Sequence, residues 1–421
     1  MTTSKSFNNS IKKILIMVAI AIIFSSSSLI GYSYWDLLED TNQSIIPIGE
    51  WRTPISTAQE FYDYLTKDDS VSGDSYYLIN DIDFSDFTWK LNSSNNDVIF
   101  RGTLDGDGYT ISNLTIRTNS STYTNIGIFP EINGGTVKNL VLDNVEISLG
   151  SNALGANKLR GGLIAGEISG GGTPLITNIT IIDCGVRATR GAGAGGIVGF
   201  IKGNNTDLTI SNIKATGLKV FNKTANSGSI IGQINKNTKS VTIGNIDMEA
   251  EIFAYNNKSY TGGVVGKIEA GASLTISNAI IEAYSINTLE TDSNWYNKNT
   301  KRYLGGIIGY SLTDSSKLSI TNVFFTGDLI TNGTAQSIDI GTAIGLNDGS
   351  YTMSNTYYSM VEFNHLDGTI GYTPESGYTG VFSTLVNESS MPSNSWWDNF
   401  AINFDNSIWG QDSSGRLYLI R

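Results

Sequence analysis

The chain of 421 residues contains one cysteine and one histidine. One cysteine cannot form an intramolecular disulfide, so Cys184 is predicted to be a small core residue rather than a reactive thiol. One histidine, His365, leaves a zinc site without its usual ligands, and no nucleophile-elbow motif surrounds it. These absences argue against a metalloprotease and against a hydrolase that uses a Ser-His-Asp triad.

The sequence also has little positive charge and few apolar residues at helical spacing. It has 27 Lys and Arg against 39 Asp and Glu, a net charge of −12 and a pI near 4.6. This balance argues against nucleic acid as a partner. Residues 150–310 differ from the rest, because they hold 15 Lys and Arg against 10 Asp and Glu. A mildly basic middle in an acidic chain suggests an edge that meets anionic glycans.

Glycine is abundant, and much of it lies in a short glycine box of the kind Gly-Gly-Ile-Val-Gly that recurs six times. The closing glycines stand at positions 166, 199, 232, 266, 309 and 345, which are 33, 33, 34, 43 and 36 residues apart. A period in this range predicts a solenoid, because one repeat cannot bury its apolar face and must stack on its neighbours.

A second motif, of the kind Leu-Thr-Ile-Ser-Asn-Ile, alternates with the glycine boxes. Apolar residues alternate along Leu208–Ile210, as in a strand, until Asn212 interrupts the pattern. Asparagine tolerates the left-handed backbone region, so we expect a bend there and three short strands per repeat. The predicted fold is an all-β, right-handed parallel β-helix of about eight rungs, in which asparagines stack roughly 4.8 Å apart as a hydrogen-bonded ladder. The copies centre on Asn113, Asn139, Asn178, Asn212, Asn245, Asn278, Asn322 and Asn355.

Together the two motifs resemble the glycine-rich GLUG-type repeat of bacterial surface proteins. The stretch Phe100–Ile111, which reads Phe-Arg-Gly-Thr-Leu-Asp-Gly-Asp-Gly-Tyr-Thr-Ile, is similar to the first rung of many pectin-lyase-like β-helices. The resemblance covers roughly residues 97–360 and implies a right-handed parallel β-helix there. It implies little about chemistry, because this scaffold serves lyases, hydrolases, adhesins and fibre proteins.

Both ends are expected to cap the coil, since something must cover the core cross-section. Residues 34–96 are predicted to form an N-terminal cap with a short helix, begun by a capping box of Ser56 with Gln59 or Thr57 with Glu60. Residues 361–421 are predicted to form a C-terminal cap. Its aromatic residues are expected to plug the end: Trp396, Trp397, Phe400, Phe404 and Trp409.

Residues 1–33 read as an export segment. Lys12 and Lys13 precede an apolar run from Ile14 to Phe24, and Gly31-Tyr32-Ser33 suits signal peptidase. We expect either a signal peptide cleaved after about Ser33 or a single-pass helical anchor that would make the membrane a partner. Both predict that the β-helix is extracellular or at the cell surface.

Four carboxylates recur at similar places after the repeated asparagines: Asp143, Asp183, Glu249 and Glu282. As an inward-aimed stripe they would serve a polysaccharide lyase or a glycoside hydrolase of the pectin-lyase-like class. A solvated turn is the simpler interpretation, because closely stacked like charges repel. A calcium site is a further candidate, at Asp81, Asp83 and Asp86, but no cofactor is expected.

A binding face is the leading prediction. The longest insertion, about Ser285 to Tyr303, accounts for the 43-residue repeat and contains Trp295, Tyr296, Lys298, Lys301 and Arg302, while Arg160 ends a neighbouring loop. Aromatic and basic side chains on one edge are typical of carbohydrate recognition. We therefore expect an exported, envelope-associated adhesin or carbohydrate-binding protein. The alternatives are the lyase or hydrolase and a structural surface spacer without a ligand.

Overall fold

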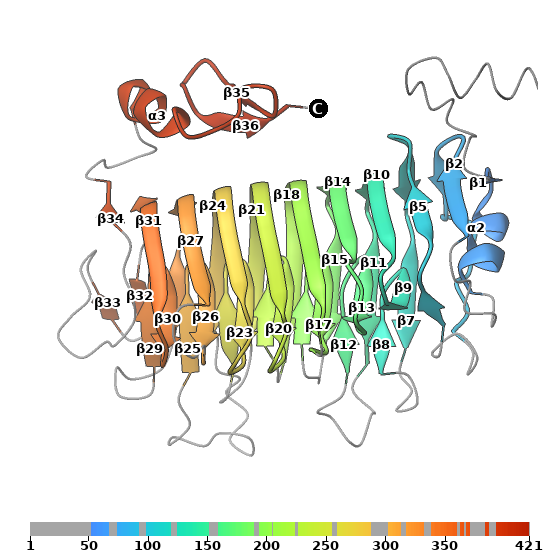
Figure 1. The fold of residues 1–421 in the computed structure, drawn as a ribbon, viewed down its shortest axis with the longest axis horizontal. Helices are drawn as coiled ribbons and strands as arrows, with labels where there is room; N and C mark the ends of the chain where they lie inside the picture. The colour runs from blue at the N-terminus through green and yellow to red at the C-terminus, as the bar shows by residue number, and fades with distance from the viewer. Residues whose placement is uncertain are drawn as a thin grey trace, which may run out of the picture. The chain divides into compact units, whose positions relative to one another are not determined.

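The repeats fold into a parallel β-solenoid of the right-handed type with about seven turns (Figure 1). The computed structural model describes residues 52–66, 74–91, 98–118, 124–150, 159–188, 193–203, 205–223, 226–254, 259–287, 302–312, 317–331, 338–359, 363–365, 368–370, 384–386 and 393–420. The predicted signal peptide or anchor lies outside these residues. Within them, no helix is both long and apolar enough to cross a membrane.

Each turn of the solenoid passes through three sheets, here named A, B and C. In sheet C every strand pairs in parallel with its counterpart in the next turn, and sheet B does the same. Sheet C contains β8 (Asn125–Ile126), β12 (Arg160–Gly161), β16 (Gly193–Gly195), β19 (Asn226–Gly228), β22 (Tyr260–Gly262), β25 (Arg302–Gly305) and β29 (Ile338–Gly341). Sheet B contains β4 (Ile99–Phe100), β9 (Phe129–Ile132), β13 (Ala165–Ile168), β17 (Val198–Ile201), β20 (Ile231–Ile234), β23 (Val265–Ile268), β26 (Ile308–Ser311) and β30 (Ile344–Asn347).

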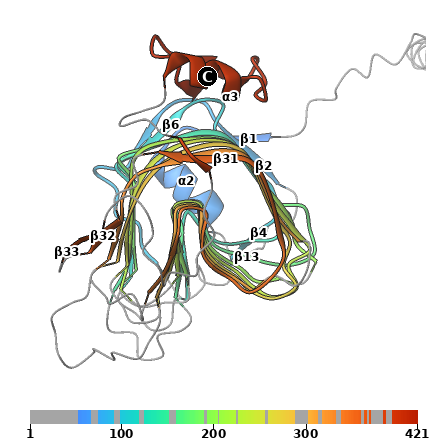
Figure 2. The same ribbon diagram turned by 90° about the vertical axis from the view of Figure 1, so that its left-hand side faces the viewer.

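Sheet A is the widest and arches over the other two when the solenoid is viewed along its axis (Figure 2). Its pairings are parallel except for β32 with β33. Its strands are β1 (Arg52–Ile55), β2 (Ser75–Leu78), β3 (Ile82–Asp83), β5 (Thr103–Asp105), β6 (Thr110–Ser112), β7 (Thr115–Thr118), β10 (Thr136–Asp143), β11 (Glu146–Leu149), β14 (Leu175–Ile182), β15 (Gly185–Ala188), β18 (Asp207–Asn222), β21 (Ser240–Ala254), β24 (Leu274–Asn287), β27 (Leu318–Thr326), β28 (Leu329–Thr331), β31 (Tyr351–Ser359), β32 (Phe363–His365), β33 (Gly368–Ile370) and β34 (Thr384–Leu385).

The glycine box forms the tight turn that joins a strand of sheet C to a strand of sheet B. In Figure 2 these turns superimpose as an inverted U beneath sheet A. Neighbouring turns come so close that a Cβ added to Gly263 would lie 1.9 Å from the carbonyl oxygen of Gly306 in the next rung. Glycine is required there because no side chain fits between two stacked backbones.

The predicted asparagine ladder is present. Each of the repeated asparagines from Asn139 to Asn355 has a positive φ, between 46° and 55°, so each marks a left-handed corner in sheet A. Amide Nδ2 atoms donate to the Oδ1 atom one rung earlier, as from Asn322 to Asn278 at 3.0 Å and from Asn355 to Asn322 at 3.1 Å. The ladder breaks once, where Asn212 donates to Thr177 instead, at 3.4 Å.

The assignment of Asn113 to this ladder is wrong. Its neighbour Ser112 pairs in register with Asp143, so Asn113 lies at a second corner, level with Asn144. Asn144 Nδ2 donates to Asn113 Oδ1 at 2.7 Å. Asp183 takes the same left-handed corner in the following rung, with φ 49°. The second corner was hidden because its residue type changes from rung to rung.

One continuous apolar core runs through the solenoid, built from the alternate residues that point inward from all three sheets. Ile210, Ile243 and Ile276 occupy equivalent places in consecutive rungs and are each 0% exposed. Cys184 is part of this core at 1% exposed, as predicted. The core therefore holds the rungs together without a cross-link.

The first helix, α2 (Ala58–Leu65), begins with the expected capping box. Thr57 is the N-cap and its Oγ1 accepts a hydrogen bond from Glu60 N at 3.1 Å. The Glu60 carboxylate returns not to Thr57 but to Ser56, whose N and Oγ each donate at 2.8 Å. The helix buries Phe61 and Leu65 against Phe84 and the main core, so it adds an aromatic layer before the first complete rung.

The C-terminal segment, residues 393–420, contains α3 (Asn394–Ala401), β35 (Trp409–Gln411) and β36 (Leu417–Leu419). Contrary to the prediction, its aromatic side chains do not plug the end of the coil. Trp397 packs on Phe324 with ring centroids 5.0 Å apart, and Trp409 Nε1 donates to Asn245 Oδ1 at 3.3 Å. These partners belong to the outer face of sheet A. The segment therefore covers a side of the solenoid.

Candidate functional site

The four candidate carboxylates, for which a solvated turn was the simpler interpretation, do not form one stripe. Asp143 pairs in register with Ile182, and Asp183 is a corner residue one position further on. Glu249 and Glu282 are register partners on β21 and β24. Only Glu249 and Glu282 are brought together by stacking. Asp143 is level with Ile182, and Ile182 is level with Thr216 in the following rung, so uncharged residues follow Asp143 along the column.

Glu282 belongs to a charge cluster under the C-terminal segment. Arg416 contacts Glu282 at 2.5 Å and Asp247 at 3.6 Å, and Leu419 N donates to Asp247 at 3.3 Å. Burial raises the pKa of both carboxyls, although the nearby Arg416 guanidinium opposes the rise. Since Arg416 lies on the two carboxylates, they act as anchors for the segment, and the arrangement offers no open acid and base pair.

Two of the three calcium candidates, Asp81 and Asp83, hold neighbouring backbone and side-chain groups, and the third, Asp86, is exposed. Asp81 accepts from Thr110 N at 2.8 Å, and Asp83 accepts from Asn113 Nδ2 at 2.8 Å and from Ser85 N at 2.9 Å. The hydrogen bond from Asn113 and those from Ser85 lower the pKa of Asp83. No group of three or more His, Cys, Asp or Glu side chains in the described part of the chain is arranged to hold a metal ion.

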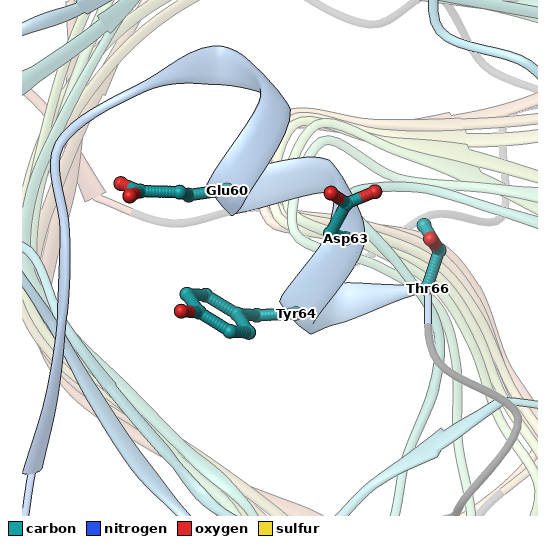
Figure 3. Close-up of a pocket in the computed structure, with 4 residues that line it drawn as sticks. All are labelled: Glu60, Asp63, Tyr64 and Thr66. Atoms are coloured by element: carbon teal, nitrogen blue, oxygen red, sulfur yellow. The ribbon is translucent and has the colours of Figure 1, made fainter.

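A hollow of about 410 Å³ lies beside α2, lined by Glu60, Asp63, Tyr64 and Thr66. Figure 3 shows Glu60 and Tyr64 extending to the same side of the helix. The Glu60 carboxylate is held by both Ser56 donors, and these hydrogen bonds lower its pKa. A carboxylate fixed by its own helix cap is a poor proton donor, so the hollow has no evident chemistry.

The most distinctive surface is a seam where sheets B and C face each other across the glycine boxes. A position on each strand before a box faces a position on the strand after it, and both positions repeat in register from rung to rung. Side chains at the two positions are in contact in four rungs: Arg160 with Glu167, Asn226 with Gln233, Tyr260 with Lys267 and Tyr303 with Tyr310. The facing residues are Asn125 with Glu131, Arg160 with Glu167, Gly193 with Phe200, Asn226 with Gln233, Tyr260 with Lys267, Tyr303 with Tyr310, and Asp339 with Leu346.

The first half of the seam is closed by charge pairing. Arg160 forms an ion pair with Glu167, which is 1% exposed, and its guanidinium carbon lies 3.9 Å from the Phe200 ring centroid. Lys202 Nζ contacts the same glutamate at 3.4 Å. Burial lowers the pKa of Arg160. Arg160, predicted to be a ligand-binding residue on a loop, lies on β12 and is engaged within the protein.

The second half of the seam carries a half-buried aromatic group, the tyrosine cluster, made of Tyr260, Tyr303, Tyr310 and Lys267. The Tyr260 and Tyr303 rings stack with centroids 5.0 Å apart and an interplanar angle of 7°, and both lie 4.9 Å from the Tyr310 ring. The Lys267 ammonium lies 4.8 Å from the Tyr260 ring centroid and 5.9 Å from that of Tyr310. All three tyrosines keep part of their surface exposed.

Charged groups border the tyrosine cluster. Tyr310 donates its hydroxyl hydrogen to Asp348 Oδ2 at 2.9 Å, and Lys267 Nζ contacts Glu269 Oε1 at 2.5 Å. Burial and the Asp348 carboxylate raise the pKa of Tyr310, and burial also raises that of Tyr303. The Tyr303 and Tyr310 phenols therefore stay protonated at physiological pH.

The predicted aromatic-basic loop lies mostly outside the described residues, including Trp295, Tyr296, Lys298 and Lys301. Arg302 is described, and the prediction that it is an accessible loop residue is wrong, because it begins β25 and is 2% exposed. The next residue, Tyr303, belongs to the tyrosine cluster. Its position could have been found from the sequence, because Tyr303 stands two positions before Gly305 and Tyr260 stands two positions before Gly262, the first glycine of each box.

Three comparisons place the chain among known proteins. No family model matches it, so the resemblance to GLUG-type repeats stays a prediction. Over 149 residues the chain is 30% identical to halomucin of Haloquadratum walsbyi, a match that covers 32% of this chain and 1% of halomucin. It is also similar in structure to a "putative immunoglobulin A1 protease" from Bacteroides ovatus, with a TM-score of 0.51 and 16% identity over 87% of this chain and 92% of that one. Identity this low shows the shared parallel β-solenoid fold alone.

Proposed function

We propose that this chain is an exported, cell-envelope-associated adhesin that binds a carbohydrate polymer. The observation that carries the proposal is the tyrosine cluster, because partly exposed aromatic rings that carry hydroxyls form an amphipathic surface of the kind that sugars contact. The cluster spans two consecutive rungs, so a polymer that lies along the seam would contact aromatic rings in both. The export-like sequence of residues 1–33 and the similarity to a protein named as a mucin support a place outside the cell.

A polysaccharide lyase or hydrolase is the second candidate and is less well supported. Such an enzyme needs carboxylates that reach the scissile bond. Among the described residues the nearest arrangement is Asp247 with Glu282, and Arg416 lies on both. A spacer without a ligand would have no reason to keep half-buried tyrosines beside Lys267 on one face of the coil.

The decisive experiment incubates the full chain with a panel of neutral, uronic-acid and amino-sugar polysaccharides. Bound protein and newly formed reducing or unsaturated ends are measured in the same tubes. We expect retention on one polymer with no new ends. New ends would overturn the adhesin in favour of the enzyme, and no retention on any polymer would favour the spacer.

Two variants tie binding to the cluster. Tyr303→Ala removes a ring from the middle of the stack and should abolish retention, whereas Tyr418→Ala, at a tyrosine 36% exposed on the C-terminal segment, should not. A second test deletes residues 288–301, which join β24 to β25 and include Trp295. We expect this deletion to weaken binding and leave the coil folded. Normal binding by the deletion variant would remove the loop from the site.

A further inference from the structure

The tyrosine cluster already holds an alkylammonium group. The Lys267 ammonium lies 4.8 Å from the Tyr260 ring centroid and 5.9 Å from the Tyr310 ring centroid. Cations are attracted to the negative faces of aromatic rings within about 6 Å of the centroid. The contact with Lys267 shows that these rings accept an ammonium group.

The groups around the rings carry more negative than positive charge. Glu269 contacts Lys267, Asp348 accepts from Tyr310, and Asp339 pairs in register with Tyr303 on the next rung. Among the groups with a contact to the rings or to Lys267, two carboxylates, Glu269 and Asp348, stand against the single ammonium of Lys267. A polyanion brought to these groups would meet a net negative charge, whereas a cation would be attracted.

Polar groups are in place for a sugar as well as for a cation. Neither the Tyr260 nor the Tyr303 hydroxyl makes a hydrogen bond to another residue in the described ranges, and the two rings lie one rung apart. Phenolic hydroxyls both donate and accept. They can therefore bond sugar hydroxyls while an amino group lies against a ring and a carboxylate.

Resting on the proposed function, we propose that the tyrosine cluster binds the protonated amino group of an amino-sugar polymer, and that it excludes uronic-acid polymers. In this proposal the ligand ammonium lies against the tyrosine cluster beside Asp348, which already accepts a hydrogen bond from Tyr310. Lys267 competes with the ligand for the rings, so its charge weakens binding. This reverses the expectation from the sequence that the basic groups of this region attract an anionic glycan.

The test uses three probes with the full chain: a β-1,4-linked glucosamine hexamer, its fully N-acetylated form and an oligogalacturonate hexamer. Affinities are measured by calorimetry in mildly acidic buffer, in which the sugar amine is protonated. We expect the glucosamine hexamer to bind most tightly. Lys267→Met, which keeps the aliphatic stem, should tighten that binding by about two- to fivefold, as expected for loss of a competing cation on a ring. Lys267→Arg keeps the charge and should bring no gain.

A second variant tests the carboxylate. Asp348→Asn keeps the size of the side chain and should weaken binding of the glucosamine hexamer while leaving the N-acetylated form unaffected. Circular dichroism of each variant checks that the solenoid is folded. Because the Asp348→Asn variant leaves Lys267 unchanged, it tests the carboxylate separately from the lysine.

The other outcomes separate this inference from the proposed function. Preference for oligogalacturonate, lost in Lys267→Met, would overturn the amine assignment and leave the adhesin standing. Equal binding of the acetylated and free hexamers would do the same, because the amine would then not be recognised. If oligolysine binds and no glycan does, the ligand is a basic protein, and both proposals fail.

Discussion

Replacing one asparagine in the middle of the ladder should cost more than its hydrogen bonds alone. Asn322 Nδ2 donates to Asn278 Oδ1 at 3.0 Å, and Asn322 Oδ1 accepts from Asn355 Nδ2 at 3.1 Å. Two hydrogen bonds of about 1 kcal/mol each are lost in Asn322→Ala. Alanine must also adopt the φ of 55° found at this corner, at a further cost of about 1 kcal/mol. We expect the free energy of unfolding to fall by about 3 kcal/mol.

Two further substitutions separate the contribution of the hydrogen bonds from that of the left-handed backbone conformation. Asn322→Gly loses the same bonds without the steric penalty and should cost about 2 kcal/mol. Asn237→Ala is the matched control, because Asn237 has a φ of 60° in an exposed turn and makes no side-chain hydrogen bond to another described residue. It should cost about 1 kcal/mol. Denaturant unfolding followed by circular dichroism measures all three, compared at equal m-value. If Asn322→Ala costs no more than the control, the ladder contributes nothing to stability.

Two other predictions concern single buried side chains. Cys184 is 1% exposed and burial raises its pKa to about 11, so at pH 8 it should resist alkylation in the folded protein and react once the chain is unfolded in urea; rapid labelling of the native form would contradict this. Trp397 is 0% exposed against Phe324, so Trp397→Ala should weaken docking of the C-terminal segment by about 3–5 kcal/mol. Limited proteolysis should then remove that segment first and leave the solenoid intact, and unchanged resistance would show that the tryptophan does not hold it.

Sequence periodicity was enough to predict the solenoid, because its repeated residues each satisfy a backbone demand. Gly263 is placed where a Cβ would collide with the next rung, and Asn322 where φ is positive. Such demands act on residue type directly and leave a visible period. The second corner leaves no such period, since its residue changes from Asn113 and Asn144 to Asp183 and then to Gly217, all with positive φ.

The side packing of the C-terminal segment could not be predicted from the sequence. Ile280 and Phe324 lie between inward residues on their strands, yet point outward against the segment. In the sequence they extend an apolar run and cannot be told from core. The burial of Arg302 could not be predicted, for the converse reason. A charged residue at the edge of a long insertion gives no sign that it is the first, buried residue of a strand.

Solenoids tend to fray, since each rung is held mainly by its two neighbours and the last rung by one. Here the C-terminal segment contacts strands of successive turns: Trp396 meets Tyr357 on β31, Arg416 meets Glu282 on β24 and Trp409 meets Asn245 on β21. A rung near that end cannot peel away while the segment remains attached to the others. The segment therefore couples these turns to one another, so that we expect several of them to unfold in a single cooperative step and not one at a time.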